Sequence, residues 1–146
     1  MSYRIATAGI RTGHALSTLR VEINLGLKKG YSGSVQDKQE VLDFITSLHE
    51  QALEQAANFI TFVVTDTVLV YAYEENGPRT QHEPGLCLVS DKSPLYAADM
   101  TDDEWKILVE RYANALGEHF EQDHVFVTYL TSEIKVLQRV VNETGK

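Results

Sequence analysis

A short glycine-containing segment at residues 28–34, Lys-Lys-Gly-Tyr-Ser-Gly-Ser, concentrates groups that bind anions. The lysines supply positive charge, the serines supply hydroxyl donors, and the glycines let backbone amides approach a ligand. A helix that begins directly after the segment would add the free N–H groups of its first turn. No Gly-Lys-Ser/Thr sequence closes the segment, so it is not a Walker loop. We expect an anion-binding turn here, or else an ordinary polar turn between a strand and a helix. Its candidate ligand residues are Lys28, Lys29, Tyr31, Ser32 and Ser34.

Three arginines in the N-terminal part of the chain, Arg4, Arg11 and Arg20, are further candidates for anion binding. The planar guanidinium group binds phosphate or carboxylate through two parallel hydrogen bonds. Together with the lysines, these arginines predict a pocket for an anionic, nucleotide-like small molecule. The alternative is that they form salt bridges with the acidic remainder of the chain or with a neighbouring subunit.

Residue types that carry catalysis or bind metals show no recognisable spacing. His119 and His124 are five residues apart, whereas a zinc-binding helix separates its histidines by four. The acids at residues 102–104 are explained by the charge that they bring to a helix N-terminus. Cys87 is typical of a small buried residue, and Ser90 lies outside a Gly-x-Ser-x-Gly motif. The sequence therefore predicts no catalytic residue, no metal ligand and no cofactor.

The chain has 146 residues, 43% of them hydrophobic and 23% charged, which is the composition of a soluble globular protein. Its net charge of -8 argues against general nucleic-acid binding. The charge is uneven, because residues 1–33 hold five basic residues and one acid, whereas the remaining residues sum to -12. The basic part is consistent with a local anion site, and the acidic part with a protein that mimics the charge of nucleic acid.

The length predicts a single domain covering residues 1–146. One cysteine excludes an internal disulfide, and the first residues lack the apolar run of a signal peptide. No stretch approaches the roughly 18 apolar residues of a membrane-spanning helix. We therefore expect the protein in the cytoplasm, or in the host cytoplasm if a phage encodes it. All three prolines lie in residues 76–95, which predicts an irregular middle of the chain.

Two amphipathic helices are expected to position the candidate groups. The first is predicted to begin at Ser34, with Asp37 three residues later in a capping-box pattern, and to run for about six turns. The second is predicted to begin at Thr101, because Glu104 completes a capping box and Trp105 starts an apolar face.

Strands are expected to fill the segments between the helices. Residues 20–28 alternate apolar and polar side chains, which is typical of a half-buried strand. Residues 59–73 are rich in β-branched and aromatic side chains. They form either one long strand with a bulge or a hairpin that turns at residues 65–67. Shorter strands are expected at residues 86–90 and 125–130.

The two ends of the chain carry additional segments. Residues 3–7 predict a strand that pairs with residues 20–28 across a turn at residues 11–14. Residues 134–141 fit a strand or a helix, and we favour the strand.

The resulting order, strand, helix, strand, strand, helix, strand, is that of an α+β ferredoxin-like antiparallel sheet with two long helices on one face. The opposite sheet face would be open and would carry aromatic side chains, so we expect a homo-oligomer that forms through this face. The aromatic residues expected there are Phe62, Tyr71, Tyr73 and Phe126.

These observations predict a non-catalytic, oligomeric binding protein that captures an anionic small molecule or a partner protein, without membrane association. An accessory protein of a phage or mobile element that inhibits or sequesters a host factor fits this size and charge. One alternative is a small-molecule enzyme, a hydrolase or isomerase, with His14, His82 or His124 as base and an arginine as anion clamp. Another is an acidic inhibitor that occupies the nucleic-acid cleft of a partner protein.

Overall fold

The main sheet has four antiparallel strands in the order β3-β4-β2-β5. We describe it from a computed structural model that covers residues 3–5, 16–29 and 33–140. The strands are β2 (Leu16–Gly26), β3 (Val63–Glu74), β4 (Pro78–Asp91) and β5 (Phe126–Ile134).

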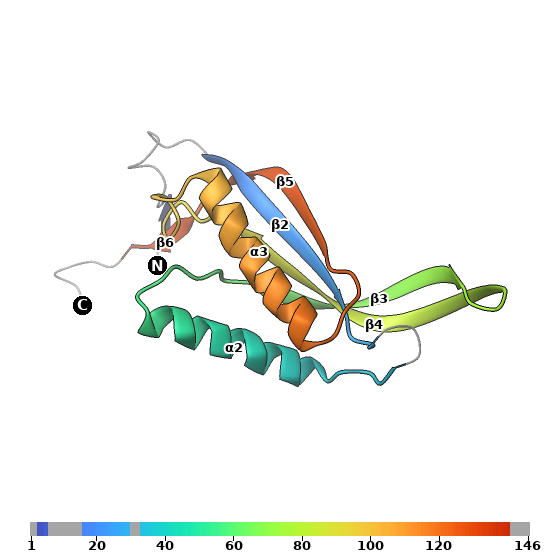
Figure 1. The fold of residues 1–146 in the computed structure, drawn as a ribbon. Helices are drawn as coiled ribbons and strands as arrows, with labels where there is room; N and C mark the ends of the chain where they lie inside the picture. Colours follow the sequence, from blue (N-terminus) through green and yellow to red (C-terminus); the bar gives the residue numbers. More distant parts are fainter. Residues whose placement is uncertain (1–2, 6–15, 30–32, 141–146) are drawn as a thin grey trace.

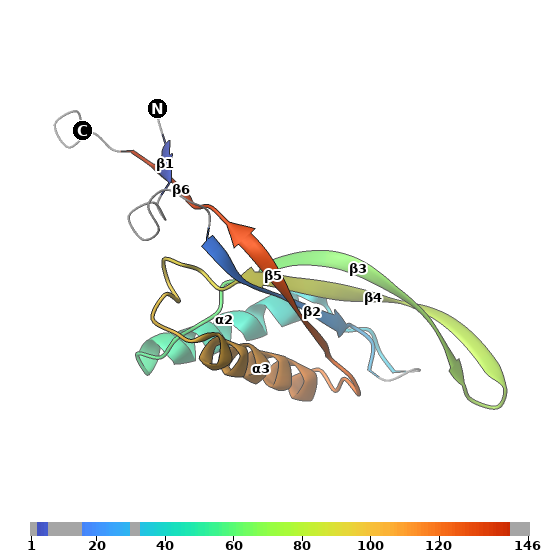
Figure 2. The ribbon, with the colours of Figure 1, turned by 90° about the horizontal axis from the view of Figure 1, so that it is seen from above.

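Two helices cover one face of this sheet and leave the other face open (Figure 1, Figure 2). They are α2 (Lys38–Glu54) and α3 (Asp102–His119). The predicted α+β ferredoxin-like plan, with both helices on one sheet face, is confirmed. None of the helices in the described part of the chain is long and apolar enough to cross a membrane.

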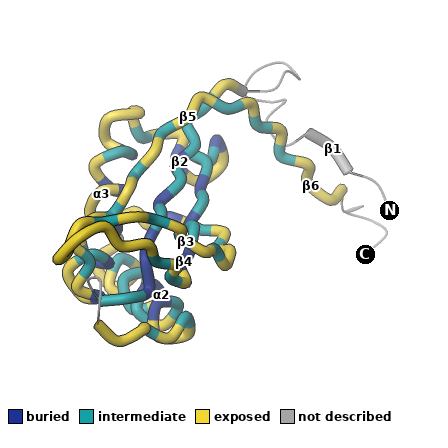
Figure 3. The backbone as a smooth tube through the Cα atoms, turned by 90° about the vertical axis from the view of Figure 1, so that its right-hand side faces the viewer, coloured by how far each residue is buried: buried dark blue, intermediate teal, exposed yellow. Residues whose placement is uncertain are grey.

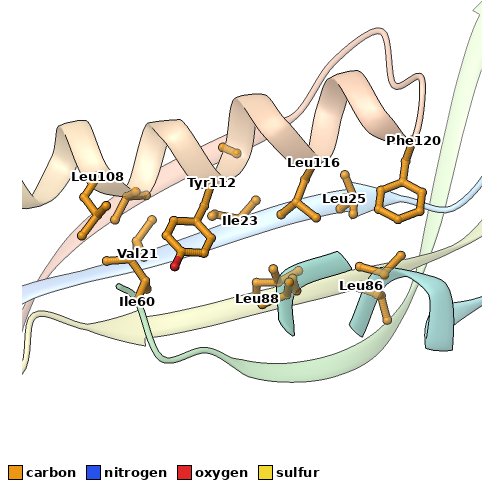
Figure 4. Close-up of a cluster of buried hydrophobic side chains, with 14 of the residues drawn as sticks. Val21, Ile23, Leu25, Ile60, Leu86, Leu88, Leu108, Tyr112, Leu116 and Phe120 are labelled. Carbon is orange, nitrogen blue, oxygen red and sulfur yellow. The ribbon is translucent and has the colours of Figure 1, made fainter. Parts of the chain in front are cut away.

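The core lies between the sheet and the helices, as Figure 4 shows. Val21, Ile23 and Leu25 of β2 are fully buried there against residues such as Leu116 of α3. Because side chains alternate along a strand, the even-numbered neighbours of these residues, Arg20, Glu22 and Asn24, lie on the open face of the sheet. The alternation read from the sequence therefore assigned the two faces of β2 correctly.

The predicted start of the second helix is confirmed. Thr101 is its N-cap, and the hydroxyl of Thr101 accepts a hydrogen bond from the N–H of Glu104 at 3.1 Å. The Glu104 carboxylate in turn accepts the N–H of Thr101 at 2.9 Å, which completes the capping box.

The predicted start of the first helix at Ser34 is wrong. The N-cap of α2 is Asp37, whose carboxylate accepts the N–H of Gln39 at 3.1 Å. Residues 34–36 instead run beside the end of β2: Val35 forms a β-bridge with Lys28, and Gln36 donates its N–H to the carbonyl of Leu27. These contacts keep the backbone extended, so the helix begins three residues later than predicted.

Residues 59–73 do not form a hairpin with a turn at residues 65–67. β3 is one continuous strand from Val63, and it pairs with β4 along its whole length. The turn between them is at Asn76 and Gly77, which both have positive φ angles. The hairpin extends beyond the end of β2 and projects past the helices, and we call residues 67–84 the arm (Figure 1, Figure 2). Most of its residues are exposed (Figure 3).

The expectation of an irregular segment over residues 76–95 is also wrong, because most of that segment is β4. Pro78 is the first residue of the strand, where a missing N–H is tolerated. The carbonyl of Pro84 faces β2 and accepts the N–H of Leu27 at 3.0 Å. The ring nitrogen of Pro84 therefore faces the same side, just beyond the point where the ladder with β2 ends at Gly85. Neither Pro78 nor Pro84 therefore lies at a position where the ladder requires a backbone N–H.

The N-terminal strand β1 (Tyr3–Ile5) pairs with β6 (Leu137–Arg139) rather than with β2. The predicted strand in the C-terminal segment is thereby confirmed, and the predicted partner of the N-terminal strand is wrong. This small ribbon lies at the end of the molecule opposite the arm (Figure 1). The turn predicted at residues 11–14 lies outside the described residues.

Phe62 does not lie on the open face, because it packs on the core side against Tyr112 with ring centroids 5.6 Å apart. Phe126 is exposed on the open face, as predicted. Tyr71 and Tyr73 lie on the arm, with their rings 6.0 Å apart.

Candidate functional site

A cavity of about 280 Å³ lies where the arm leaves the sheet, and we call it the arm cavity. Three parts of the chain form its walls: the end of β2, the arm, and the segment that joins α3 to β5. Its lining residues are Asn24, Gly26, Lys28, Leu69, Tyr71, Ala72, Glu83, Gln122, Asp123, His124 and Phe126.

Glycine at position 26 makes room for two polar side chains beside the cavity. A Cβ atom at Gly26 would lie 2.9 Å from Oε1 of Gln122 and 3.3 Å from the Glu83 carboxylate. Any larger residue would push these two groups away from the strand. Gly26 pairs with Gly85 across the β2–β4 ladder, so neither of these two strands carries a side chain at this point.

Backbone contacts hold the polar groups of the arm cavity in place. The Glu83 carboxylate accepts the N–H of Lys28 at 3.2 Å. The side-chain amide of Gln122 donates to the carbonyls of Lys28 and Phe120, at 2.9 and 3.1 Å. Glu83 and Gln122 are therefore oriented by the same short stretch at the end of β2, although they come from distant parts of the sequence.

The cavity wall carries two carboxylates, Glu83 and Asp123, and one ammonium group, that of Lys28. Tyr71 from the arm and Phe126 from β5 contribute aromatic surface. Flat aromatic rings bind the face of a heterocycle or a cation, and carboxylates bind cations and hydroxyl groups. The arrangement thus suits a ligand with an aromatic ring system, hydroxyl groups and a positive charge.

The predicted anion-binding turn lies next to this cavity, but its lysines have different surroundings. Lys28 lines the arm cavity. Lys29 forms an ion pair with Glu121, and the hydrogen bond and charge of Lys29 lower the pKa of that carboxyl. The carbonyl of Ser34 accepts the N–H of Lys29 at 3.1 Å. Tyr31 and Ser32 lie outside the described residues, so the role of the turn stays a prediction.

Of the three predicted arginines, only Arg20 has a described side chain, and it lies away from the turn. Arg20 and Gly26 mark opposite ends of the part of β2 that pairs with β4, roughly 20 Å apart at about 3.3 Å per residue. Arg20 lines a second cavity, together with Asp91. Arg4 lies in β1, where only the backbone is described, and Arg11 lies outside the described residues.

Glu83, Gln122 and Asp123 were not predicted from the sequence as site residues. Glu83 precedes Pro84 and Gly85, a combination that is typical of a turn. Glu83 is 55 residues from Lys28, and Gln122 is 94 residues from it, so no local pattern links them. The glycines at positions 26 and 85 could have indicated the site, because a glycine inside a strand often marks a place where a ligand or another part of the chain comes close to the backbone.

Comparisons with known proteins found similarity at the level of structure alone. No protein-family model matches the sequence, and no curated protein sequence matches it. A solved structure of a phage SAM lyase in complex with S-methyl-5'-thioadenosine matches with a TM-score of 0.57 and 14% sequence identity, over 82% of this chain and 90% of that chain. The phage SAM lyase in its apo state matches with a TM-score of 0.55 and 15% identity, over 87% and 91% of the two chains. The protein therefore shares the fold of a phage SAM lyase.

Proposed function

We propose that this protein binds an adenosine-containing sulfur compound in the arm cavity and degrades SAM (S-adenosylmethionine) there as a lyase. The observation that carries the proposal is the fold shared with a phage SAM lyase over 90% of that chain. The sequence offered a small-molecule enzyme as an alternative to a binding protein. The proposal follows that alternative, but the reaction is that of a lyase and not of a hydrolase or isomerase.

The walls of the arm cavity support an adenosine ligand. An adenine ring stacks favourably on aromatic side chains, which Tyr71 and Phe126 supply. The amide of Asn24 has both a donor and an acceptor for the edge of the base, and the Asp123 carboxylate accepts hydrogen bonds from ribose hydroxyls.

The charge of the cavity supports SAM more than a phosphate ester. SAM carries a sulfonium, an ammonium and a carboxylate group, so it has one net positive charge. Glu83 and Asp123 outnumber Lys28 in the wall, which favours a cation. The Tyr71 ring adds a surface to which a sulfonium is attracted. We infer that Glu83 provides the negative charge that holds the cationic part of SAM.

The proposed reaction needs no general base from the protein. Release of S-methyl-5'-thioadenosine from SAM requires that the bond between sulfur and the methionine side-chain carbon breaks, with its electron pair returning to sulfur. A lyase adds no water, and we infer that an oxygen of the substrate's own carboxylate bonds to that carbon and closes a lactone. The positive charge of sulfur and the negative charge of the carboxylate disappear together, and no proton moves. The protein therefore contributes by holding the two reacting ends in contact and by excluding water.

The test is to incubate the purified protein with SAM and measure S-methyl-5'-thioadenosine by liquid chromatography with mass spectrometry. Binding of SAM and of S-methyl-5'-thioadenosine is measured separately by calorimetry. We expect Glu83→Gln to weaken SAM binding about tenfold or more, because one charged contact is lost. The same substitution should change binding of the uncharged thioadenosine much less. Glu74→Gln, at the exposed tip of the arm, is the matched control and should leave both unchanged.

The outcomes separate the alternatives. Formation of the thioadenosine supports the lyase. Binding of SAM without its consumption supports the sequestering protein that the sequence analysis favoured. A protein that neither binds nor consumes SAM would overturn the proposal. Equal binding of SAM by the Glu83→Gln variant and the unchanged protein would overturn it as well.

The open sheet face supports the proposal of a homo-oligomer. Phe126 and Leu130 of β5 are exposed there and lie on the same side of the strand. Burial of such side chains against a second copy is favourable. Native mass spectrometry should show an oligomer for the unchanged protein and a smaller species for Leu130→Glu, and a monomer for the unchanged protein would contradict this.

The similarity to a phage protein also supports the proposal of a phage accessory role. A SAM-degrading protein in the host cytoplasm would lower the supply of the methyl donor. Expression of the protein in a bacterial host should therefore reduce intracellular SAM, and a normal SAM level would speak against this role.

A further inference from the structure

A second and larger cavity, of about 410 Å³, lies at the outer edge of the sheet, and we call it the edge cavity. The ladder between β3 and β4 begins at Val63, opposite Val89, whereas β4 stays paired with β2 as far as Asp91. The segment that precedes β3 therefore separates from the last residues of β4. The space between them forms the edge cavity, which the loop after β4 closes on one side.

One ion pair lies in the wall of the edge cavity. Nη1 of Arg20 is 3.6 Å from Oδ2 of Asp91, and the two side chains are 41% and 28% exposed. This separation is longer than a strong charge-assisted hydrogen bond, so both groups keep hydrogen-bonding capacity for a ligand. The hydroxyl of Ser132 donates to Oδ1 of Asp91 at 3.1 Å, which fixes the carboxylate from the other side.

The other walls of the edge cavity are mainly apolar. Phe59 is 44% exposed and Tyr96 is 79% exposed, and both line the cavity with Val63. The indole of Trp105 forms part of its inner wall, and Trp105 is the single tryptophan of the chain. The cavity thus combines one positive group, one negative group and an apolar surface.

We propose that the edge cavity binds a free α-amino acid with an apolar side chain. The carboxylate of such a ligand pairs with the guanidinium of Arg20, and its ammonium group pairs with the carboxylate of Asp91. The side chain of the ligand lies against Phe59, Val63 and Tyr96. The volume is within the range of small-molecule sites, which begins at about 300 Å³.

Other ligand classes fit this wall less well. A phosphate would pair with Arg20 but would be repelled by the neighbouring carboxylate of Asp91. A purely apolar molecule would remove water from both charged groups and offer them no partner, which is costly. A zwitterion that carries its ammonium and carboxylate groups on the same carbon atom satisfies the two groups together.

The edge cavity is independent of the proposed lyase site. It shares no lining residue with the arm cavity. S-methyl-5'-thioadenosine, which has no amino-acid group, should therefore not compete with an amino acid for the edge cavity.

The proposal is tested on the unchanged full-length protein with L-methionine, L-leucine and L-phenylalanine at concentrations up to about 10 mM. Binding is followed by the fluorescence of Trp105 and by calorimetry. N-acetyl-L-methionine lacks the ammonium group, and L-methionine methyl ester lacks the carboxylate. We expect at least one of the three amino acids to bind to the edge cavity. Each of the two derivatives should bind there at least about tenfold more weakly than that amino acid. The absence of any signal overturns the proposal, and so does equal binding of the amino acids and their derivatives.

Two variants locate the site. Arg20→Gln and Asp91→Asn should each weaken amino-acid binding at least about tenfold. Arg79→Gln, an exposed arginine at the tip of the arm, is the matched control and should bind as the unchanged protein does. Unchanged binding in both variants overturns the assignment. If either variant fails to fold, as judged by circular dichroism, the comparison of ligands on the unchanged protein still decides.

Discussion

Replacement of Gly85 by alanine should disturb both the stability of the sheet and the shape of the arm cavity. Gly85 lies in β4 between Gly26 of β2 and Thr67 of β3. A Cβ atom at this position would overlap Cδ1 of Leu69, and it would lie 2.8 Å from Oγ1 of Thr67 and 3.0 Å from the carbonyl oxygen of Leu25. The carbonyl belongs to the backbone of a central strand and moves little, so Leu69 and Thr67 must move instead.

The expected magnitude follows from two opposing effects. Overpacking of this kind costs about 1–3 kcal/mol of folding free energy. Alanine also reduces the conformational freedom of the unfolded chain, which stabilises the folded protein by about 0.4–1 kcal/mol. We therefore expect Gly85→Ala to lower the free energy of unfolding by about 1–2 kcal/mol. Because Leu69 lines the arm cavity, the binding of S-methyl-5'-thioadenosine should weaken as well.

Urea denaturation followed by circular dichroism measures the first effect, and calorimetry measures the second. Gly117→Ala is the matched control, because its new Cβ would meet only Cγ2 of Val125, at 3.0 Å, and a shift of that methyl group by a few tenths of an ångström relieves the contact. Alanine inside helix α3 gains about 1 kcal/mol over glycine in helix propensity, so this variant should be at least as stable as the unchanged protein. A Gly85→Ala variant of unchanged stability would refute the close packing described for this position. A destabilised variant with unchanged thioadenosine affinity would refute the role of Leu69 in shaping the cavity.

Three further predictions concern the body of the molecule. Leu88→Ala should lower the free energy of unfolding by about 2–5 kcal/mol in urea denaturation, since Leu88 is fully buried in the core, and a loss below about 1 kcal/mol would contradict this. Thr101→Ala should cost about 0.5–2 kcal/mol through loss of the capping box. The hydrogen bonds from Thr101 also hold the pKa of Glu104 below its ordinary value of 4.5, so their contribution is present above pH 4.5 and is lost as the pH falls below it. Thr101→Ala keeps the backbone N–H that contributes most to this shift, so the test is Glu104→Ala, whose stability difference from the unchanged protein should shrink in acid, and a constant difference would contradict this. Burial and the neighbouring Glu110 raise the pKa of Tyr129, whose hydroxyl donates to that carboxylate at 2.6 Å. Absorbance titration should therefore show a late-ionising tyrosine that is missing in Tyr129→Phe.

The fold could be predicted from the sequence because its main signals are local. The capping box at Thr101 involves residues three positions apart, and the alternation from Val21 to Leu25 directly shows which side of the strand is buried. The N-cap of α2 is Asp37 and not the predicted Ser34, because residues 34–36 are held by the end of β2. That contact is not visible in the local pattern of serine and aspartate.

The sequence by itself determined the two layers of the molecule, its acidic charge and the open sheet face. Only the tertiary structure decided that β3 and β4 continue past β2 as an arm, and which residues this arm brings to the cavity. Glu83, Lys28 and Gln122 meet there across separations of 55 and 94 residues. Their positions depend on strand register, on sheet twist and on the room left by Gly26, which arise from pairing between distant segments. The same pairing separates Arg20, inside β2, from Lys28, just after its end, and each of them lines a different cavity.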